Sequence, residues 1–250
     1  MSDNKWSIYS IEELKPERQG LKAALVGKKR AHSFLALVDE SKREIVRELH
    51  FGGYATDGAV ADRYASNPMN ILATLADSFG LSQVFKAVSD KAGIGDNLVR
   101  LKGVQTGKRR NIDELSAQSL QLCMTDAPEK VLARWNAACK AAVVLNEADI
   151  PTLSGETVIR PTVNCRSGTR MALEAMELPA TPVMADYKPG WERRLRDEVP
   201  GLSAVKPETR EASFDQLMAE NLRLKNDAYN TRPHARLRLA HGMNGASVPA

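Results

Sequence analysis

AHSFLALV (31–38) and EIVRELHF (44–51) are the two apolar runs that decide the fold. Both are rich in residues that favour strands, and the polar segment DESKR (39–43) between them is typical of a turn. The pattern predicts a β-hairpin with a loop of about five residues. Three glycines in FGGYATDG (51–58) then indicate that the second strand ends there.

Helical spacing predicts the elements that would cover this hairpin. Residues 68–93 and 113–124 have apolar side chains at helical intervals. Asp126 stands three residues before Glu129, which is capping-box spacing, and opens a long helix that should end near Asp149. We therefore expect an α+β fold with a small antiparallel sheet packed against helices. Further elements are expected at 15–27 (helix), 95–105 and 158–163 (strands), and 208–230 (amphipathic helix).

The character of the chain changes after Pro179, where a loop-like stretch precedes the late helix. We expect one domain over residues 1–180 and a helical extension with a disordered tail over 181–250. The late helix has an apolar stripe that either contacts the core or docks a partner, so a protein could bind through 208–230. The stripe contains Leu217, Leu222 and Leu224.

The 250 residues carry a net charge of +4, and the charges of both signs are interleaved. Such a balance neither requires nor excludes an acidic partner. Two short basic runs, 28–30 and 108–110, contain no aromatic residues, so we expect solvated loops and no nucleic-acid site. No stretch approaches about 18 apolar residues, and no signal-peptide pattern opens the chain. We expect no membrane span, and a protein that is cytoplasmic or is exported without a cleavable signal peptide.

Three cysteines are present, and one of them is placed for chemistry. Their odd number and wide spacing exclude a disulfide framework and a zinc knuckle, so we expect no metal and no cofactor. Cys123 and Cys139 lie inside apolar helical patterns and are predicted to be core residues. Cys165 follows Asn164, a good N-cap for a helix over 165–177. A thiol at a helix N-terminus is favoured as the thiolate, and nearby backbone N–H groups could hold an oxyanion.

Two histidines converge on the predicted hairpin. If the turn is centred on Ser41, paired positions have numbers that sum to about 82, which places His32 opposite or beside His50. His32 would then be a base for Cys165, and His50 the group that orients it. Glu48, on the same face as His50, is the alternative orienting residue. The competing interpretation is a pair of structural histidines at the margin of a sheet.

Four segments together resemble a known superfamily. HSFLALVDES, VRELHFGGYATDG, the helix that ends in AVVLNEADIP, and VNCRSGTRMALEAMEL are similar to circularly permuted papain-like enzymes, the relatives of NlpC-type peptidases in which the histidine precedes the cysteine. The resemblance covers about residues 31–178 of the chain. It implies a permuted papain-like fold of bacterial type, with Cys165 as nucleophile, His32 as general base and His50 as the third residue.

The function that this resemblance implies is hydrolysis or acyl transfer at a peptide, amide or ester bond. A bacterial protein of this kind could act within its own cell or be delivered as a secreted effector. Asn164, Glu48 and Arg170 would support the site.

Two alternatives stay open. The same scaffold could be a binding or interaction module without catalysis. The hexapeptide CRSGTR (165–170) is also similar to the active-site loop of rhodanese-type sulfurtransferases, in which backbone N–H groups and arginines, here including Arg170, stabilise an anion. The strand and the upstream signature that accompany that loop are missing from this sequence.

Overall fold

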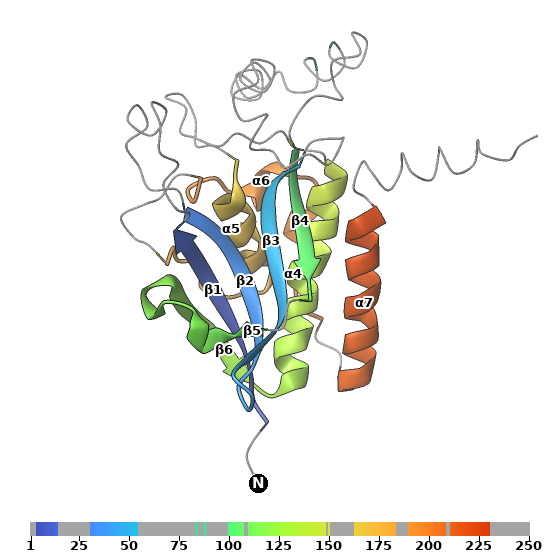
Figure 1. The fold of residues 1–250 in the computed structure, drawn as a ribbon. Coiled ribbons are helices and arrows are strands. Elements are labelled where there is room, and N and C mark those ends of the chain that lie inside the picture. Colours follow the sequence, from blue (N-terminus) through green and yellow to red (C-terminus); the bar gives the residue numbers. More distant parts are fainter. Residues whose placement is uncertain are drawn as a thin grey trace, which may run out of the picture.

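A computed structural model describes residues 4–14, 31–54, 84, 88, 100–107, 110–148, 150, 163–183, 190–208 and 211–230. Within these residues a six-stranded antiparallel sheet is covered by helices on one face, which confirms the α+β class (Figure 1). The strand order is β4-β3-β2-β1-β6, and β5 pairs with β3. The strands are β1 (Trp6–Leu14), β2 (Ala31–Asp39), β3 (Glu44–Tyr54), β4 (Arg100–Thr106), β5 (Arg110–Asn111) and β6 (Leu120–Asp126).

The predicted hairpin is confirmed as β2 and β3. Phe34 pairs with His50 and Ala36 with Glu48, so the pairs in this part of the hairpin sum to 84 rather than 82. Toward the turn, a register shift between Leu37 and Val38 lowers this sum by one, because Val38 pairs with Ile45. The hairpin is not the start of the sheet, however. Strand β1 lies between β2 and β6 and is therefore central (Figure 1).

The predicted helix over 113–124 is wrong. Residues Ile112–Glu114 and Ala117–Ser119 form 3-10 turns, and Leu120 begins strand β6. Strand β6 fills the second edge of β1, with Ser7 paired to Thr125 and their hydroxyls 2.7 Å apart. The apolar residues of this segment look helical in isolation, but the open edge of β1 supplies backbone partners that local spacing does not reveal.

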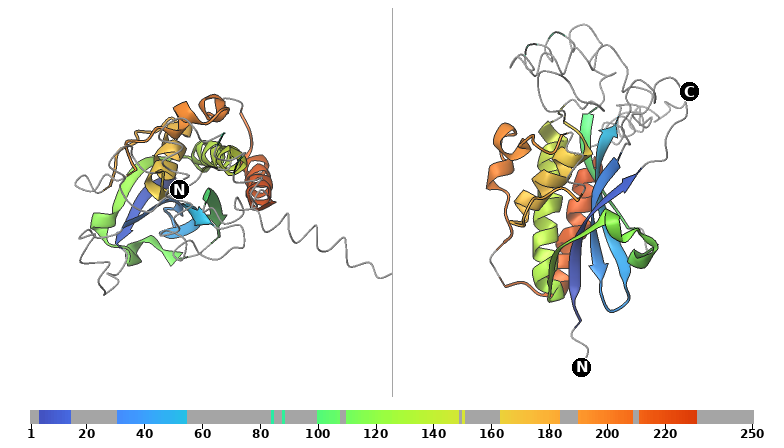
Figure 2. Two further views of the ribbon diagram at one scale, coloured as in Figure 1. Left: turned by 90° about the horizontal axis from the view of Figure 1, so that it is seen from above. Right: turned by 90° about the vertical axis from the view of Figure 1, so that its left-hand side faces the viewer.

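The long helix is confirmed as α4 (Pro128–Ala148). It lies on one face of the sheet with α5 (Cys165–Ala175), α6 (Leu195–Glu198) and α7 (Phe214–Asn230), as Figure 2 shows. One core fills the space between the layers, with Trp135 at its centre and fully buried. The predicted helix at 15–27 and the run 158–162 lie outside the described residues. So does the predicted helix 68–93, except Val84 and Val88, which are helical.

The described part of the chain beyond residue 180 completes this core. Helix α7 packs along α4, where the Asn136 side chain donates to the carbonyl of Leu217 at 2.9 Å. Several apolar residues from this part are buried in the same cluster as Trp135. They are Trp191, Leu195, Val199, Leu202, Leu217 and Leu224. Among the described helices, none combines the length and the apolar character that crossing a membrane requires.

The outer edge of β4 is closed by one side chain of α4. The Oδ1 atom of Asn146 accepts from the Gly103 N–H at 2.7 Å, and its Nδ2 donates to the Gly103 carbonyl at 2.9 Å. The amide group thus makes the pair of bonds that a further strand would make. A side chain at position 103 is excluded, because a Cβ there would lie 2.7 Å from Ala142 Cβ.

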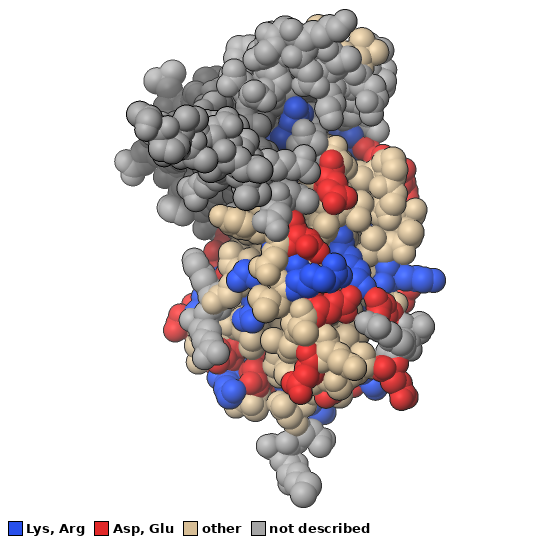
Figure 3. Space-filling model, turned by 90° about the vertical axis from the view of Figure 1, so that its right-hand side faces the viewer, with Lys and Arg blue, Asp and Glu red and all other residues tan. Residues whose placement is uncertain are grey.

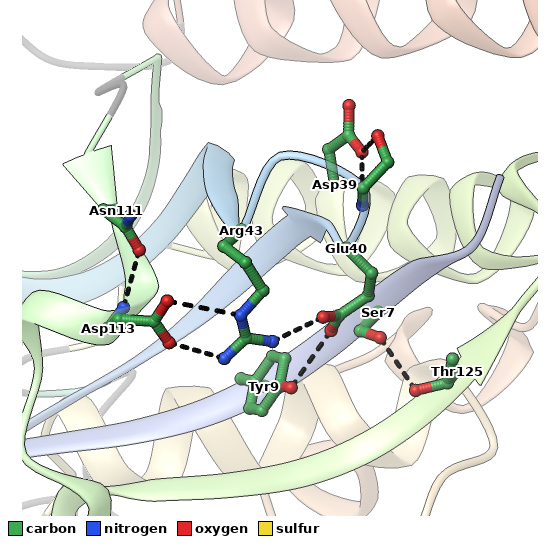
Figure 4. A network of polar contacts seen from close by, with 9 residues as sticks. Ser7, Tyr9, Asp39, Glu40, Arg43, Asn111, Asp113 and Thr125 are labelled. Carbon is green, nitrogen blue, oxygen red and sulfur yellow. Dashed lines mark hydrogen bonds and ion pairs between the residues drawn. The ribbon is translucent and has the colours of Figure 1, made fainter. Parts of the chain in front are cut away.

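The face of the sheet away from the helices is covered by the turns after β5. Phe34, Ala36, Val38 and Ile45 form a second buried cluster there with Ile112 and Ile11. Near the tip of the hairpin, Arg43 bonds Glu40 and Asp113, and the Tyr9 hydroxyl donates to Glu40 at 3.0 Å (Figure 4). The bond from Arg43 lowers the pKa of Asp113. These polar contacts hold the tip of the hairpin against the covering turn.

Candidate functional site

Asn164 is the N-cap of α5, as predicted, and Cys165 is the first residue of the helix. The Asn164 Oδ1 atom accepts from the Arg166 N–H at 2.9 Å, and the Ser167 hydroxyl completes a capping box with the Asn164 N–H. The N–H of Gly168 donates to the Asn164 carbonyl. The N–H groups of Arg166 and Gly168, in the first turn after Cys165, are therefore both bonded to Asn164.

Three contacts fix α5 on the sheet. Arg166 forms an ion pair with Glu12 of β1 at 2.7 Å, and the Ser33 hydroxyl of β2 donates to Thr169 at 3.1 Å. Gly168 lies against the ring of Phe51, where a Cβ would come within 2.4 Å of the ring. The helix thus approaches the sheet closely because residue 168 lacks a side chain.

The hexapeptide CRSGTR forms the first turns of α5 and is not a loop. Its arginines are engaged within the fold, since Arg166 pairs with Glu12 and Arg170 bonds both Glu174 and the carbonyl of Trp191. A sulfurtransferase loop presents its N–H groups and arginines to an anion. This segment directs them to the protein itself, so the similarity of six letters does not extend to the structure.

The two predicted histidines are in contact and belong to a chain of polar groups. The Nε2 atom of His32 lies 3.0 Å from Nδ1 of His50, and Nε2 of His50 lies 2.8 Å from Oε2 of Glu48. Because an ionised carboxylate only accepts, His50 carries its proton on Nε2. One proton is shared in the hydrogen bond between Nδ1 of His50 and Nε2 of His32. The three side chains thus form one line of hydrogen bonds with Glu48 at its buried end.

Arg110 holds the far end of this chain and was missed in the sequence. Its Nε donates to Oε1 of Glu48 at 2.8 Å, and its guanidinium lies 5.6 Å from the centre of the Phe34 ring. The ring of Phe34 in turn stacks on His50 with centroids 4.5 Å apart. The basic run 108–110 was interpreted as a solvated turn, and no local signal marks its last residue as a partner of Glu48.

Strand alternation places His32 and Cys165 on different faces. The side chain of Ser33 meets Thr169 of α5, so the helix covers the Ser33 face of β2. His32 projects from the opposite face with Phe34, toward the covering turns. Helix α5 and the histidine chain both lie at the end of the sheet where β2 begins. The described contacts therefore unite His32, His50 and Glu48, and direct pairing of His32 with Cys165 stays a prediction.

Of the other two thiols, Cys139 is buried and Cys123 is partly buried, and their chemistry differs from that expected at Cys165. Burial raises the pKa of Cys139 to about 12 and that of Cys123 to about 11. Cys139 belongs to α4, as predicted, but Cys123 is on strand β6. At neutral pH both are thiols with little nucleophilic character. Cys165 is half-buried at the start of α5.

A separate hollow lies on the helix side of the sheet, between β3 and α7. Its volume is about 310 Å³, and Arg47 and Lys225 supply positive charge to it. Met218 and Leu222 supply apolar surface, and Leu222 is 59% exposed, unlike Leu217 and Leu224 of the same predicted stripe. On the side of the molecule that carries α7, basic side chains lie among acidic ones (Figure 3).

Comparison with known proteins identifies no relative. No family model, no curated protein and no solved structure matches the chain. Within the described ranges, no group of three or more His, Cys, Asp or Glu side chains is arranged to hold a metal ion. The functional argument therefore depends on the geometry of the histidine chain and of α5.

Proposed function

We propose that the chain is a thiol-dependent hydrolase or acyltransferase that acts on peptide, amide or ester bonds. In this proposal Cys165 is the nucleophile, and His32, aligned by His50 and Glu48, is the base. The observation that carries the proposal is the unbroken line of hydrogen bonds from Glu48 through His50 to His32. A carboxylate and a second imidazole in line with His32 are the kind of groups that orient a general base.

The reaction takes place at the end of the sheet where α5 and β2 both begin. In this step the thiol proton of Cys165 passes to the imidazole of His32. The thiolate attacks the carbonyl carbon, and the positive end of the α5 dipole stabilises the oxyanion. His32 then returns the proton to the leaving group, and water or another acceptor releases the acyl group from sulfur.

The pH dependence of thiol alkylation tests this proposal. Iodoacetamide rates at each cysteine, read by mass spectrometry between pH 5 and 10, should show Cys165 reacting with a midpoint below about 8.5. Cys123 and Cys139 serve as internal controls, because burial raises their pKa values to about 11 and 12. His32→Ala should remove the faster alkylation of Cys165. His234→Ala, a control that replaces a histidine outside the proposed site, should leave that rate unchanged. Slow and equal reaction at all three thiols would refute the proposal.

A second measurement follows the acyl transfer itself. With p-nitrophenyl acetate the protein should release one equivalent of nitrophenol in a burst and carry one acetyl group on Cys165. Cys165→Ser should abolish both, while Cys123→Ser should leave both unchanged. Release without any acetylated protein would show that water, and not the thiol, attacks the ester.

A non-catalytic binding module on the same scaffold is the second candidate. Two observations favour it: the separate faces of His32 and Cys165, and the hollow beside α7 in which Arg47 and Lys225 flank exposed Leu222. Such a surface suits an acidic partner with an apolar side chain. Two results together would decide for this candidate. No cysteine would show enhanced alkylation, and an acidic amphipathic peptide would bind saturably to the wild-type protein but not to Leu222→Asp.

A further inference from the structure

Arg110 is fixed in place by three groups that come from three different strands. It donates to Glu48 of β3 at 2.8 Å and to Glu13 of β1 at 3.1 Å, and its guanidinium lies over the ring of Phe34 of β2. Its own strand, β5, pairs with β3 at Ile45, which sets the position of its backbone. The planar guanidinium suits this place because it can donate in one direction and stack in another.

The carboxylate of Glu48 needs this partner. The side chain is only 1% exposed, and a buried carboxylate without donors would take up a proton. Burial raises its pKa, but the bonds from His50 and the charge of Arg110 outweigh burial, so that the pKa lies below its ordinary value. Each oxygen has its own donor: Oε1 accepts from Arg110 and Oε2 from His50.

We infer that Arg110 is the positioning residue of the histidine chain: by occupying Oε1 of Glu48, it keeps Oε2 directed at His50. This inference rests on the proposed function only for its effect on rate. With Oε2 held, the Nε2–H of His50 stays directed at Glu48, and Nδ1 of His50 faces His32. Without Arg110, Glu48 would be protonated or would rotate, and His50 could then exchange between tautomers.

Nitrogen-15 NMR of the histidine rings tests the positioning directly. The wild-type protein at pH 8 should show His50 as a single Nε2–H tautomer with a protected ring proton, assigned by its loss in His50→Ala. Arg110→Gln should give averaged His50 nitrogen shifts and rapid exchange of that proton, and Arg110→Lys an intermediate result. Arg43→Gln is the matched control, because it removes an arginine from the same face that bonds Glu40 and Asp113 but not Glu48. An unchanged His50 spectrum in folded Arg110→Gln would overturn the inference.

Acetyl transfer to Cys165, measured on the same variants, separates this inference from the proposed function. We expect Arg110→Gln to lower the maximal rate about tenfold or more with little change in the half-saturating ester concentration, because binding does not involve the relay. The His50 spectrum could change as expected in Arg110→Gln while even the wild-type protein shows no acetyl transfer. That result would support the positioning role of Arg110 and refute the proposed hydrolase. If Arg110→Gln changes the His50 spectrum but transfers acetyl groups at the normal rate, control of the His50 tautomer does not matter for the reaction. That result would overturn the contribution of Arg110 to the rate.

Discussion

The guanidinium of Arg166 lies 2.7 Å from the carboxylate of Glu12, and both side chains are almost fully buried. The pair ties the first turn of α5 to the central strand β1, over a sequence distance of 154 residues. It therefore fixes the end of the helix that begins with Cys165. A buried ion pair is sensitive to the loss of one partner, because the remaining charge has then been removed from water without compensation.

Glu12→Gln should lower the free energy of unfolding by about 3–5 kcal/mol, since it removes the buried carboxylate charge that lies 2.7 Å from the Arg166 guanidinium. Replacement of both residues, Glu12→Leu with Arg166→Met, should lower it by less than the single change. Urea titrations of the three proteins, with wild type as reference, measure the difference. Equal losses in the single and double variants would contradict this account of the pair.

Gly168→Ala should destabilise the protein although alanine is the better helix former. The usual gain is about 1 kcal/mol, but the new Cβ would lie 2.4 Å from the Phe51 ring, and overpacking costs about 1–3 kcal/mol. Thermal unfolding should therefore show a lower Tm. Adding Phe51→Leu to Gly168→Ala should recover part of the loss, and failure of that rescue would mean that Phe51 is not the obstacle.

Asn146→Leu should weaken the edge of β4. The Gly103 N–H and carbonyl would each lose a buried partner, at about 1–3 kcal/mol for a group left unsatisfied. Hydrogen exchange should then be faster at the Gly103 amide than at the amides of the central strand β1. Lys225→Leu, a substitution on α7 outside this contact, is the comparison that should leave Gly103 protected.

The stability of the protein should fall in acid partly through Glu48. Burial alone would raise the pKa of Glu48, but its bonds with His50 and Arg110 hold the pKa below that of the unfolded chain. The contribution of Glu48 is thus present above its unfolded pKa of about 4.3 and is lost as the pH falls through the lower, folded value. Unfolding in urea from pH 7 to 3 should show a shallower decline for Glu48→Gln than for wild type. A parallel decline would assign the acid sensitivity to other carboxyl groups.

Local patterns in the sequence are sufficient to predict the hairpin, helix α4 and the Asn164 cap. Each depends on residues a few positions apart, and each is confirmed. Strand β6 was mistaken for a helix because its partner, β1, lies more than one hundred residues away in the chain. Long-range pairing leaves little trace in the spacing of one segment, since the apolar residues of a short run fit either period.

The two faces of β2 could not be distinguished from its sequence. Leu35 and Leu37 are buried under the helices, and Phe34, Ala36 and Val38 are buried on the other face. A strand that is covered on both sides shows no polar alternation. The contact of His32 with His50 follows from register and could be predicted. The side of the sheet from which His32 projects, relative to α5, depends on packing across the sheet, and so does the contact of Arg110 with Glu48.

The central place of β1 has a consequence during synthesis. Among the described strands β1 comes first in the chain, its partner β6 follows more than one hundred residues later, and α7 comes later still. Until then a nascent chain has β1 with one edge open and Glu12 without Arg166. Productive folding must therefore wait for the late segments, and chaperones that shield exposed strand edges would increase the yield of native protein.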